Sequence, residues 1–336
     1  MATLADVARA AGVSVSVVSR VLNNDPALRA REDTRDRVRQ AAAKLSYTPN
    51  HAARALRLAH ADTIALVVPD VTNVIFSELL RGVDDEAERE GFQVLLGRSD
   101  RIEPGSDFLR RLVDQGRVDG FLLQVSDDQD VHEAERTMAN RIPVVLLHAR
   151  GARRGSVILD DVAGGRLATE HLLGLGHTDI AFVGGPPNAQ TSRRREEGYA
   201  RAMADAGVRR RSAWTLRSGY QPADGRRAAL QLLDEGVRRP TALVVANINA
   251  AVGAVQGARE LGITIPDQLS VVAIHDTWVA EATSPGLTAV RMPLYELGCE
   301  GVRQLTARLS GDRPQDLMIS DPPPTLVIRR STAPPA

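Results

Sequence analysis

After residue 60, short apolar runs rich in β-branched residues alternate with amphipathic stretches, and this alternation limits the fold more than any other feature of the sequence. Phe76–Glu90 and Asp161–Leu175 show the helical spacing most clearly. Such alternation predicts an α/β body with parallel sheets and helices on both of their faces. The expected strands are Ile64–Pro69, Gln93–Leu96, Phe121–Val125, Val144–Leu147, Val157–Leu159, Ile180–Gly184, Leu243–Ala246 and Val271–Ile274.

The length of this α/β region predicts two lobes. Roughly 270 residues exceed what one sheet and its core can hold. We expect the chain to cross between the lobes near Asp160, near Ala289 and again near Asp321–Pro324. Because ligands of such folds bind at the carboxyl ends of the strands, the cleft between the lobes is the expected ligand site.

The beginning of the chain differs from the body, because it contains three short helical patterns and no expected strand. Leu4–Ala11 has helical spacing, and Gly12 can end that helix in the left-handed conformation. Ser14 can cap a second helix, and a third is expected from about Thr34 to Leu45. Two helices joined by a short glycine turn predict a helix-turn-helix, whose small core the third helix closes. The inward positions expected of the second and third helices are Val17, Val18, Val21, Leu22, Val38, Ala41, Ala42 and Leu45.

Ser46–His60 predicts a short fourth helix between the head and the body. Pro49 ends the third helix, and the segment after it has little apolar surface, so a helix there is marginal in water. We expect this hinge to become ordered only on binding. An apolar tip beside a cation, as in Leu56 and Arg57, is what a minor-groove wedge needs. The residues expected to act in the hinge are Asn50, Ala53, Leu56 and Arg57.

Charge is distributed unevenly along the chain, although the net charge is zero. Residues 1–60 carry ten basic and five acidic side chains, whereas the remaining residues carry 32 and 37. A basic head on a mildly acidic body predicts a polyanionic partner for the head alone.

Other features of the composition limit the class of protein. Cys299 is the only cysteine, which excludes an internal disulfide and a cysteine-rich metal site. We see no signal peptide and no apolar run long enough to span a membrane, so we expect a cytoplasmic protein without membrane contact. We expect no cofactor and no metal ligand.

The sequence resembles the lactose/galactose repressor (LacI/GalR) family of bacterial transcription regulators. In the head and hinge, the stretches that carry the resemblance are TLADVARAAGVSVSVVSRVLNN and YTPNHAARALR. In the body, they are ILDDVAGGRLATEHLLGLGHTDIAFVGG, RREEGYARAM, SVVAIHDT and SPGLTAVRMPLYELG, in the family's order. The resemblance covers essentially the whole chain, and it implies an all-α DNA-binding head and a two-lobed body similar to the periplasmic sugar-binding proteins.

The resemblance implies which residues of the head contact operator DNA. In the family the start of the second helix enters the major groove, which assigns base contacts to Val15, Ser16 and Arg20. Arg20 can donate two bonds to a guanine, and Val15 can contact a thymine methyl group. The family often has threonine where this chain has Val17, so one hydroxyl contact is expected to be missing. Short polar side chains suited to phosphate contacts are Ser19, Asn23 and Thr34.

The resemblance also implies an effector site in the cleft of the body. Arg195 stands where the family places an effector-binding arginine, and a buried guanidinium can hold a hydroxyl pair or a carboxylate. Asn247 stands where the family uses asparagine for ligand hydroxyls, and Tyr220 is the expected stacking surface. The expected effector residues are Phe76, Gln124, Ser126, Asp160, Thr191, Arg193, Arg195, Tyr220, Asn247 and His275.

Two departures from the family bear on the identity of the effector. His275 and Ile248 stand where the family usually has aspartates. Losing these acceptors while keeping Arg193 and Arg195 predicts a more cationic cleft. A sugar, a sugar acid, a phosphorylated sugar and another carboxylate are therefore all candidate effectors, and His275 is alternatively a donor to a hydroxyl.

Two other classes of protein were weighed against a regulator. A transport-type binding protein would need a signal peptide and would not carry a basic helix-turn-helix head. An enzyme is disfavoured because no GxSxG, HExxH or GxxxxGK motif occurs. The glycine runs VAGGR and FVGGPP lack the spacing of a dinucleotide-binding loop.

The expected regulator is a dimer that binds a pseudo-palindromic operator and is switched by a small molecule. The sign of the switch stays open, because an inducer or a corepressor would fit equally. The end of the sequence, RRSTAPPA, has no heptad leucines, which favours a dimer over a tail-linked tetramer. The expected domains are residues 1–48 (helix-turn-helix), 49–60 (hinge) and 61–336 (effector binding and dimerisation), with lobes at about 61–160 plus 290–321 and about 161–289 plus 322–336.

Overall fold

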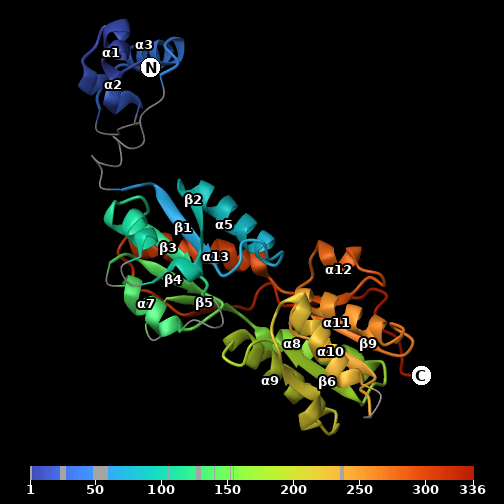
Figure 1. Ribbon diagram of the computed structural model, residues 1–336. Coiled ribbons are helices and arrows are strands. Elements are labelled where there is room, and N and C mark those ends of the chain that lie inside the picture. Colours follow the sequence, from blue (N-terminus) through green and yellow to red (C-terminus); the bar gives the residue numbers. More distant parts are fainter. Residues whose placement is uncertain are drawn as a thin grey trace. The chain divides into compact units, whose positions relative to one another are not determined.

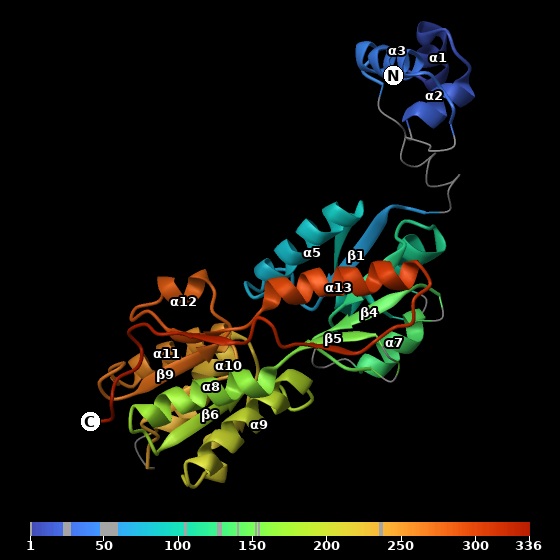
Figure 2. The same ribbon diagram turned by 180° about the vertical axis from the view of Figure 1, so that it is seen from behind.

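The chain forms two compact units, Met1–Ala61 and Asp62–Ala336, which are described separately (Figures 1 and 2). They are seen in a computed structural model that describes residues 2–22, 28–47, 60–103, 106–125, 130–139, 141–151, 153, 155–234 and 238–336. The residues expected to contact DNA or effector that lie outside these ranges are Asn23, Asn50, Ala53, Leu56, Arg57 and Ser126.

The first unit contains the expected three-helix head, formed by α1 (Leu4–Ala11), α2 (Val15–Leu22) and α3 (Glu32–Lys44). Thr3 and Asp6 form a capping box at the start of α1, and Gly12 ends it with φ of +67°. The Ser14 hydroxyl accepts a bond from the Val17 amide at 3.3 Å, as expected of a cap. The buried core of the head consists of Val7, Ala8, Ala11, Val18, Val21, Val38, Ala41 and Ala42.

Two positions of the head are placed differently from the sequence expectation. Leu45 was expected to point inward, but α3 ends at Lys44 and Leu45 is 37% exposed. Val17 is half-buried and packs against the core of the head. The valine that replaces the family's threonine is therefore partly used in packing.

The second unit contains two sheets of six strands, which confirms the expectation of two lobes with largely parallel sheets. The first sheet is parallel throughout, whereas the second is parallel except at its β10–β12 edge. In spatial order, the first sheet contains β11 (Leu317–Ile319), β5 (Ser156–Leu159), β4 (Val144–Leu147), β3 (Gly120–Leu123), β1 (Thr63–Val68) and β2 (Gln93–Arg98). The second contains β12 (Thr325–Val327), β10 (Thr288–Arg291), β9 (Ser270–Ile274), β8 (Ala242–Val245), β6 (Ile180–Gly184) and β7 (Thr215–Arg217).

Helices cover both faces of the first sheet, so its strands are continuous apolar runs. Alternate residues of β1 divide between the two faces. Ile64 and Leu66 share a core with residues of α5 and α13, and Ala65 and Val67 share another with residues of α6 and α7. The helices of this lobe are α5 (Phe76–Glu90), α6 (Asp107–Leu109) with the π-helical turn Arg110–Asp114, α7 (Val131–Ala139), α13 (Leu294–Leu309) and the 3₁₀ turn Ser99–Arg101.

Helices also cover both faces of the second sheet (Figure 2). The step from β6 to β7 runs opposite to the steps from β7 to β8 and from β8 to β9, so right-handed crossovers place α9 on one face and α10 and α11 on the other. Helix α8 packs beside α9. The helices of this lobe are α8 (Asp161–Gly174), α9 (Gln190–Asp205), α10 (Pro222–Leu233), α11 (Ile248–Glu260), α12 (Trp278–Ala282) and the 3₁₀ turn Ser212–Trp214.

The chain passes between the sheets three times. It leaves the first sheet after β5, which ends at Leu159, and returns after β10 to form α13 and β11. Ala289 pairs with Val327 inside the second sheet, so the second crossing begins after Arg291 rather than at Ala289 itself. The third crossing lies between β11 and β12.

Backbone contact between α8 and α9 depends on two glycines. A Cβ atom on Gly165 would lie 2.1 Å from the Arg195 carbonyl oxygen, and one on Gly198 would lie 2.1 Å from the Val162 carbonyl oxygen. Real Cβ atoms do not approach oxygen so closely, so only glycine allows the helices to touch here. This packing places residues 195–198 of α9 against the start of α8.

Replacing Gly165 with alanine should destabilise the second unit by about 3 kcal/mol, because the added methyl group must push the backbone of α9 away. The matched control is Gly174→Ala at the end of the same helix, where a Cβ would meet nothing within 4 Å. That change should be neutral or add up to about 1 kcal/mol through helix propensity. Urea unfolding of both variants measures the difference, and equal losses would show that the close contact is not needed.

The described residues show two further absences. None of the described helices combines the length and apolar character needed to cross a bilayer. Within the same residues, no group of three or more histidine, cysteine, aspartate or glutamate side chains is arranged to hold a metal ion.

Candidate functional site

A cavity of about 440 Å³ lies between the two lobes of the second unit, at the carboxyl ends of the strands. Its position agrees with the general rule for parallel α/β sheets. The first lobe contributes Pro69, Asp70, Asn73, Ile75, Phe76, Gln124, Val125, Val131, Leu147, His148 and Ala149. The second contributes Pro186, Asn188, Gln190, Thr191, Arg195, Ser218, Gly219, Tyr220, Gln221, Asp224, Asn247 and His275.

Most of the effector residues expected in the body line this cavity. They are Phe76, Gln124, Thr191, Arg195, Tyr220, Asn247 and His275. Asp160 and Arg193 do not line it. The Asp160 carboxylate caps α8 by accepting a bond from the Ala163 amide at 2.9 Å. The Arg193 guanidinium is directed to the Asn188 carbonyl oxygen, 3.4 Å away.

The helical geometry of α9 explains why Arg193 is excluded. Thr191 and Arg195 are four residues apart and share the face of α9 that borders the cavity. Arg193 lies between them, so its side chain projects from a different face. The Thr191 hydroxyl lies 2.9 Å from the Tyr220 hydroxyl, and this pair forms part of the cavity wall.

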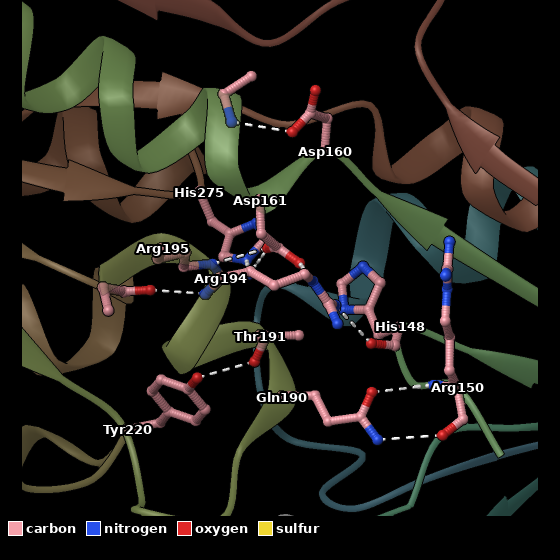
Figure 3. Close-up of polar contacts among 12 residues, drawn as sticks. His148, Arg150, Asp160, Asp161, Gln190, Thr191, Arg194, Arg195, Tyr220 and His275 are labelled. Carbon is pink, nitrogen blue, oxygen red and sulfur yellow. Dashed lines mark hydrogen bonds and ion pairs between the residues drawn. The ribbon is translucent and has the colours of Figure 1, made fainter. Parts of the chain in front are cut away.

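A buried carboxylate organises the arginines beside the cavity (Figure 3). Asp161, whose side chain is fully buried, accepts bonds from Arg195 Nε at 2.8 Å and from Arg194 Nε and Nη2 at 3.0 and 2.8 Å. Burial alone would raise the pKa of Asp161, but Arg195 and Arg194 outweigh it and hold this pKa below its usual value. Asp161 therefore remains ionised and balances the charge of one of the two guanidinium groups.

Arg195 is 2% exposed and has partners on several sides. Besides Asp161, it donates to the Ala246 carbonyl oxygen at 2.6 Å and to His275 Nε2 at 2.8 Å. Its guanidinium is thus a fixed part of the cavity wall. Asp161, which it shares with Arg194, compensates part of its charge before any ligand arrives.

Two buried histidines face each other in the cavity (Figure 3). The His148 and His275 ring centroids are 6.3 Å apart, with 21° between the ring planes. Burial lowers the pKa of His148 to about 4; the smaller effect of Asp161 raises this pKa, and those of Arg195 and Arg194 lower it further. Burial, Arg195 and His148 hold the pKa of His275 well below its usual value. Both rings are therefore neutral at physiological pH.

Polar contacts connect the lobes on both sides of the cavity. Arg194 Nη2 donates to the His148 carbonyl oxygen at 2.8 Å. The Gln190 side chain accepts from the Arg150 amide and donates to its carbonyl oxygen, both at 3.0 Å. Asn249 Nδ2 donates to Asn73 Oδ1 at 2.9 Å. The residues that line or flank the cavity thus also fix the relative position of the lobes.

Several residues of this site were not expected from the sequence, namely Asn73, His148, Asp161, Gln190, Arg194 and Asn249. His148 directly follows the apolar run of β4, just as His275 follows β9, so its place after a strand was an available signal. Asp161 follows the end of β5 by two residues, but nothing marked it as the partner of Arg194 and Arg195, which lie more than 30 residues away in the sequence.

The expected DNA-contacting residues of the head are only partly open to solvent. Val15 is 45% exposed and Ser16 is exposed, whereas Ser19, Arg20 and Thr34 are half-buried. Val15 and Ser16 lie in the first turn of α2 and Arg20 in its last turn. The first turn therefore presents an open surface of the kind a recognition helix needs.

Comparisons with known proteins cover both units. A family model described as bacterial regulatory proteins, lacI family, matches residues 3–50, and a periplasmic binding protein-like domain matches residues 169–332. The HTH-type transcriptional regulator DegA of Bacillus subtilis is 34% identical over 99% of this chain and 98% of its own length. The chain belongs to the lacI family of bacterial regulatory proteins.

A second relative is similar to this chain over nearly the full length of both proteins. The HTH-type transcriptional repressor PurR of Erwinia tasmaniensis is 32% identical, with 99% of this chain and 97% of that protein covered.

Solved structures of lacI-family proteins match in fold. A regulator from Mycobacterium smegmatis matches 81% of this chain and 100% of its own, with 42% identity and a TM-score of 0.76. The Lac repressor dimer bound to operator and the anti-inducer ONPF matches 99% of both chains, with 28% identity and a TM-score of 0.80. The CelR–cellobiose complex matches 98% of this chain and 100% of its own, with 27% identity and a TM-score of 0.71.

Proposed function

We propose that this lacI-family chain is a ligand-responsive transcriptional repressor that binds a pseudo-palindromic operator as a dimer. The observation that carries the proposal is the combination of two features in one chain. A helix-turn-helix exposes the start of its second helix, and the body has a ligand-sized cavity between two lobes. The Lac repressor match, whose structure is a dimer on operator DNA, supports the same combination over the whole chain.

The head supplies the DNA contacts in this proposal. Val15, Ser16 and Arg20 read base edges in the major groove, and Ser19, Asn23 and Thr34 contact phosphates. The hinge at residues 49–60 orders in the central minor groove, where Leu56 wedges into a base step beside Arg57, and Asn50 and Ala53 complete the hinge helix.

The cavity between the lobes is the proposed effector site, and a sugar or sugar derivative is the proposed ligand class. The lining combines polar side chains from both lobes with the aromatic rings of Phe76 and Tyr220, a mixture that can bind the hydroxyl groups and the apolar face of a sugar. The cellobiose complex of CelR, similar over nearly all of this chain, supports the same class. The ligand shifts the balance between lobe arrangements, and this changes hinge order and operator affinity.

We further infer that the protein acts in the bacterial cytoplasm, where operator DNA is found, and that it catalyses no reaction. The relatives matched over the full chain are transcriptional regulators, which supports both inferences. Domain boundaries at residues 48 and 60 fit this division of labour between head, hinge and body.

Replacing Arg20 with alanine should weaken operator binding by about 1–3 kcal/mol, because a bidentate contact to guanine is lost. The loss should be confined to one symmetric pair of positions in the half-sites. The measurement is selection of random DNA by the wild-type and variant proteins, followed by titration of the selected operator.

The matched control for that experiment is Arg9→Ala, which removes the same charge from α1, where Arg9 pairs with Asp6 at 3.2 Å. It should alter affinity for all sequences equally. A failure of the wild-type protein to select any palindromic sequence would overturn the proposed function, and a uniform loss in Arg20→Ala would make Arg20 a phosphate contact.

A further inference from the structure

His148 and His275 occupy equivalent positions in the two lobes. The strand orders of the two sheets correspond one to one, and β4 and β9 take the same place in them. Each histidine is the first residue after its strand. Each has a left-handed backbone, with φ of +63° for His148 and +72° for His275. Non-glycine residues seldom adopt this conformation, so the backbone is held in a costly state that turns both rings into the cavity.

The bond to Arg195 fixes the proton on His275. A guanidinium nitrogen can only donate, so His275 Nε2, 2.8 Å from Arg195 Nη2, must accept. In a neutral imidazole the proton then lies on Nδ1. His275 Nδ1 is buried and has no hydrogen-bond partner among the described residues, and the same is true of His148 Nε2. An unsatisfied buried donor costs about 1–3 kcal/mol, which a ligand acceptor would recover.

No arginine or lysine without a partner is available to an anion in the described part of the cavity lining. Among the described residues that line it, Arg195 is the only arginine or lysine, and it is bound to Asp161. Asp70 and Asp224 also line the cavity; Asp224 is paired with Arg227, and the Asp70 carboxylate would repel an anion. The expectation of a cationic cleft counted Arg193 and Arg195, but Arg193 lies outside the lining and Arg195 is already bonded to Asp161, which it shares with Arg194.

We propose that His148 and His275 are the specificity-determining pair of the cavity, and that they select an uncharged effector whose oxygen accepts a hydrogen bond from His275 Nδ1–H. This inference rests on the proposed function, since it names the ligand class of the same site. An aspartate in place of His275 would accept from a ligand hydroxyl, whereas His275 donates.

The same proton argues against a metal ion between the two rings. A metal bound to Nδ1 would require the proton to move to Nε2, where it would face the N–H of Arg195. Two donors would then oppose each other in a buried site.

The first test is nuclear magnetic resonance of the full-length protein with isotope-labelled histidine, assigned with His148→Asn and His275→Asn. The ring nitrogen shifts should show His275 as a neutral Nδ1–H tautomer at physiological pH. An Nε2–H tautomer or a charged imidazolium at His275 would overturn the proposal.

The second test compares acetone with acetate, which have similar shape and accept hydrogen bonds without donating them. Acetone should perturb the His275 Nδ1–H resonance at lower concentration than acetate, with sodium chloride as the ionic-strength control. A preference for acetate, or no response to either compound at molar concentration, would contradict an available neutral donor.

Asparagine and aspartate are similar in size, so two substitutions at His275 distinguish loss of the hydrogen-bond donor from a change in side-chain shape. His275→Asn can accept from Arg195 and still donate to the cavity, so acetone binding, followed at the His148 resonance, should be retained. His275→Asp presents only acceptors, and acetone binding should weaken about fivefold or more, as expected for loss of roughly 1 kcal/mol. Equal behaviour of the two variants would refute the donor role.

The outcome for the proposed function is measured separately, as operator binding by the same ligand-free proteins. If the wild-type protein recognised no operator, the proposal that it is a transcriptional regulator would be refuted. An acetate preference with normal operator binding would refute only the uncharged ligand class.

Discussion

Replacing Asp161 with asparagine should lower the free energy of unfolding of the body by about 3–5 kcal/mol, because a buried ion pair loses one partner while the other stays buried. Asp161 is fully buried, and it is the carboxylate that Arg194 and Arg195 share. The asparagine keeps one acceptor oxygen but removes the charge. Arg195, 2% exposed, would then keep its positive charge with only neutral acceptors. Urea unfolding followed by circular dichroism measures the loss.

Asp160, the residue before Asp161, provides a matched control for this substitution. Asp160 caps α8 through the Ala163 amide, and asparagine caps helices as well as aspartate does. Asp160→Asn should therefore change the unfolding free energy by less than about 0.5 kcal/mol. Comparable losses in the two variants would mean that the Asp161 charge has no special role.

The long apolar runs of the body were predictable because burial on both faces of a parallel sheet leaves them almost without polar residues. The eight expected strands all occur, two of them with the expected ends and the others with ends shifted by at most two residues. The strands β7, β10, β11 and β12 were not expected. Each is only three or four residues long and contains at least one exposed residue, whereas the expected strands of four residues are buried throughout, so no comparable apolar run marks them.

The site was predictable where a residue directly follows a strand. Gln124, Asn247 and His275 all do so, within two residues, and all line the cavity. Arg193 was misplaced because the sequence did not show that α9 begins at Gln190, so that Thr191, Arg193 and Arg195 all lie in its first turns. Around a helix, side chains two residues apart point in different directions, whereas those four residues apart share a face. A helix here therefore separates Arg193 from Thr191 and Arg195.

The charge of the cavity could not be obtained from the sequence. Arginines near an expected cleft suggest an anionic ligand only if no carboxylate reaches them first. Asp161 reaches both Arg194 and Arg195, although it lies 33 and 34 residues before them. Such pairing depends on the contact between α8 and α9, which in turn depends on glycines whose packing role no periodicity reveals.

Replacing Arg194 with methionine should raise the population of molecules with separated lobes by about 10- to 100-fold. The reason is that a hydrogen bond from a charged donor contributes about 1.5–3 kcal/mol. Arg194 joins Asp161 of the second lobe to the His148 carbonyl oxygen of the first. Methionine keeps much of the length of the side chain but none of its donors. Energy transfer between dyes on cysteines introduced at exposed Glu133 and Glu197, one in each lobe, should report a longer mean distance.

The control for this release is Arg201→Met, on the same helix. Arg201 is exposed and pairs only locally with Glu197, so the same loss of charge removes no contact between lobes. For this comparison the dyes are placed at Glu133 and Asp205 in all three proteins. This placement leaves Glu197, the partner of Arg201, intact. The two variants should then differ, with the wild-type distance kept in Arg201→Met and lengthened in Arg194→Met.

Lobe separation would also affect the cavity, because Arg194 bonds to the backbone of His148, the histidine proposed to bind effector from the first lobe. A lobe that moves away carries His148 from His275 and leaves the ligand with half of its site. Unchanged distances in Arg194→Met would show that the remaining contacts, from Gln190 to Arg150 and from Asn249 to Asn73, hold the lobes without it.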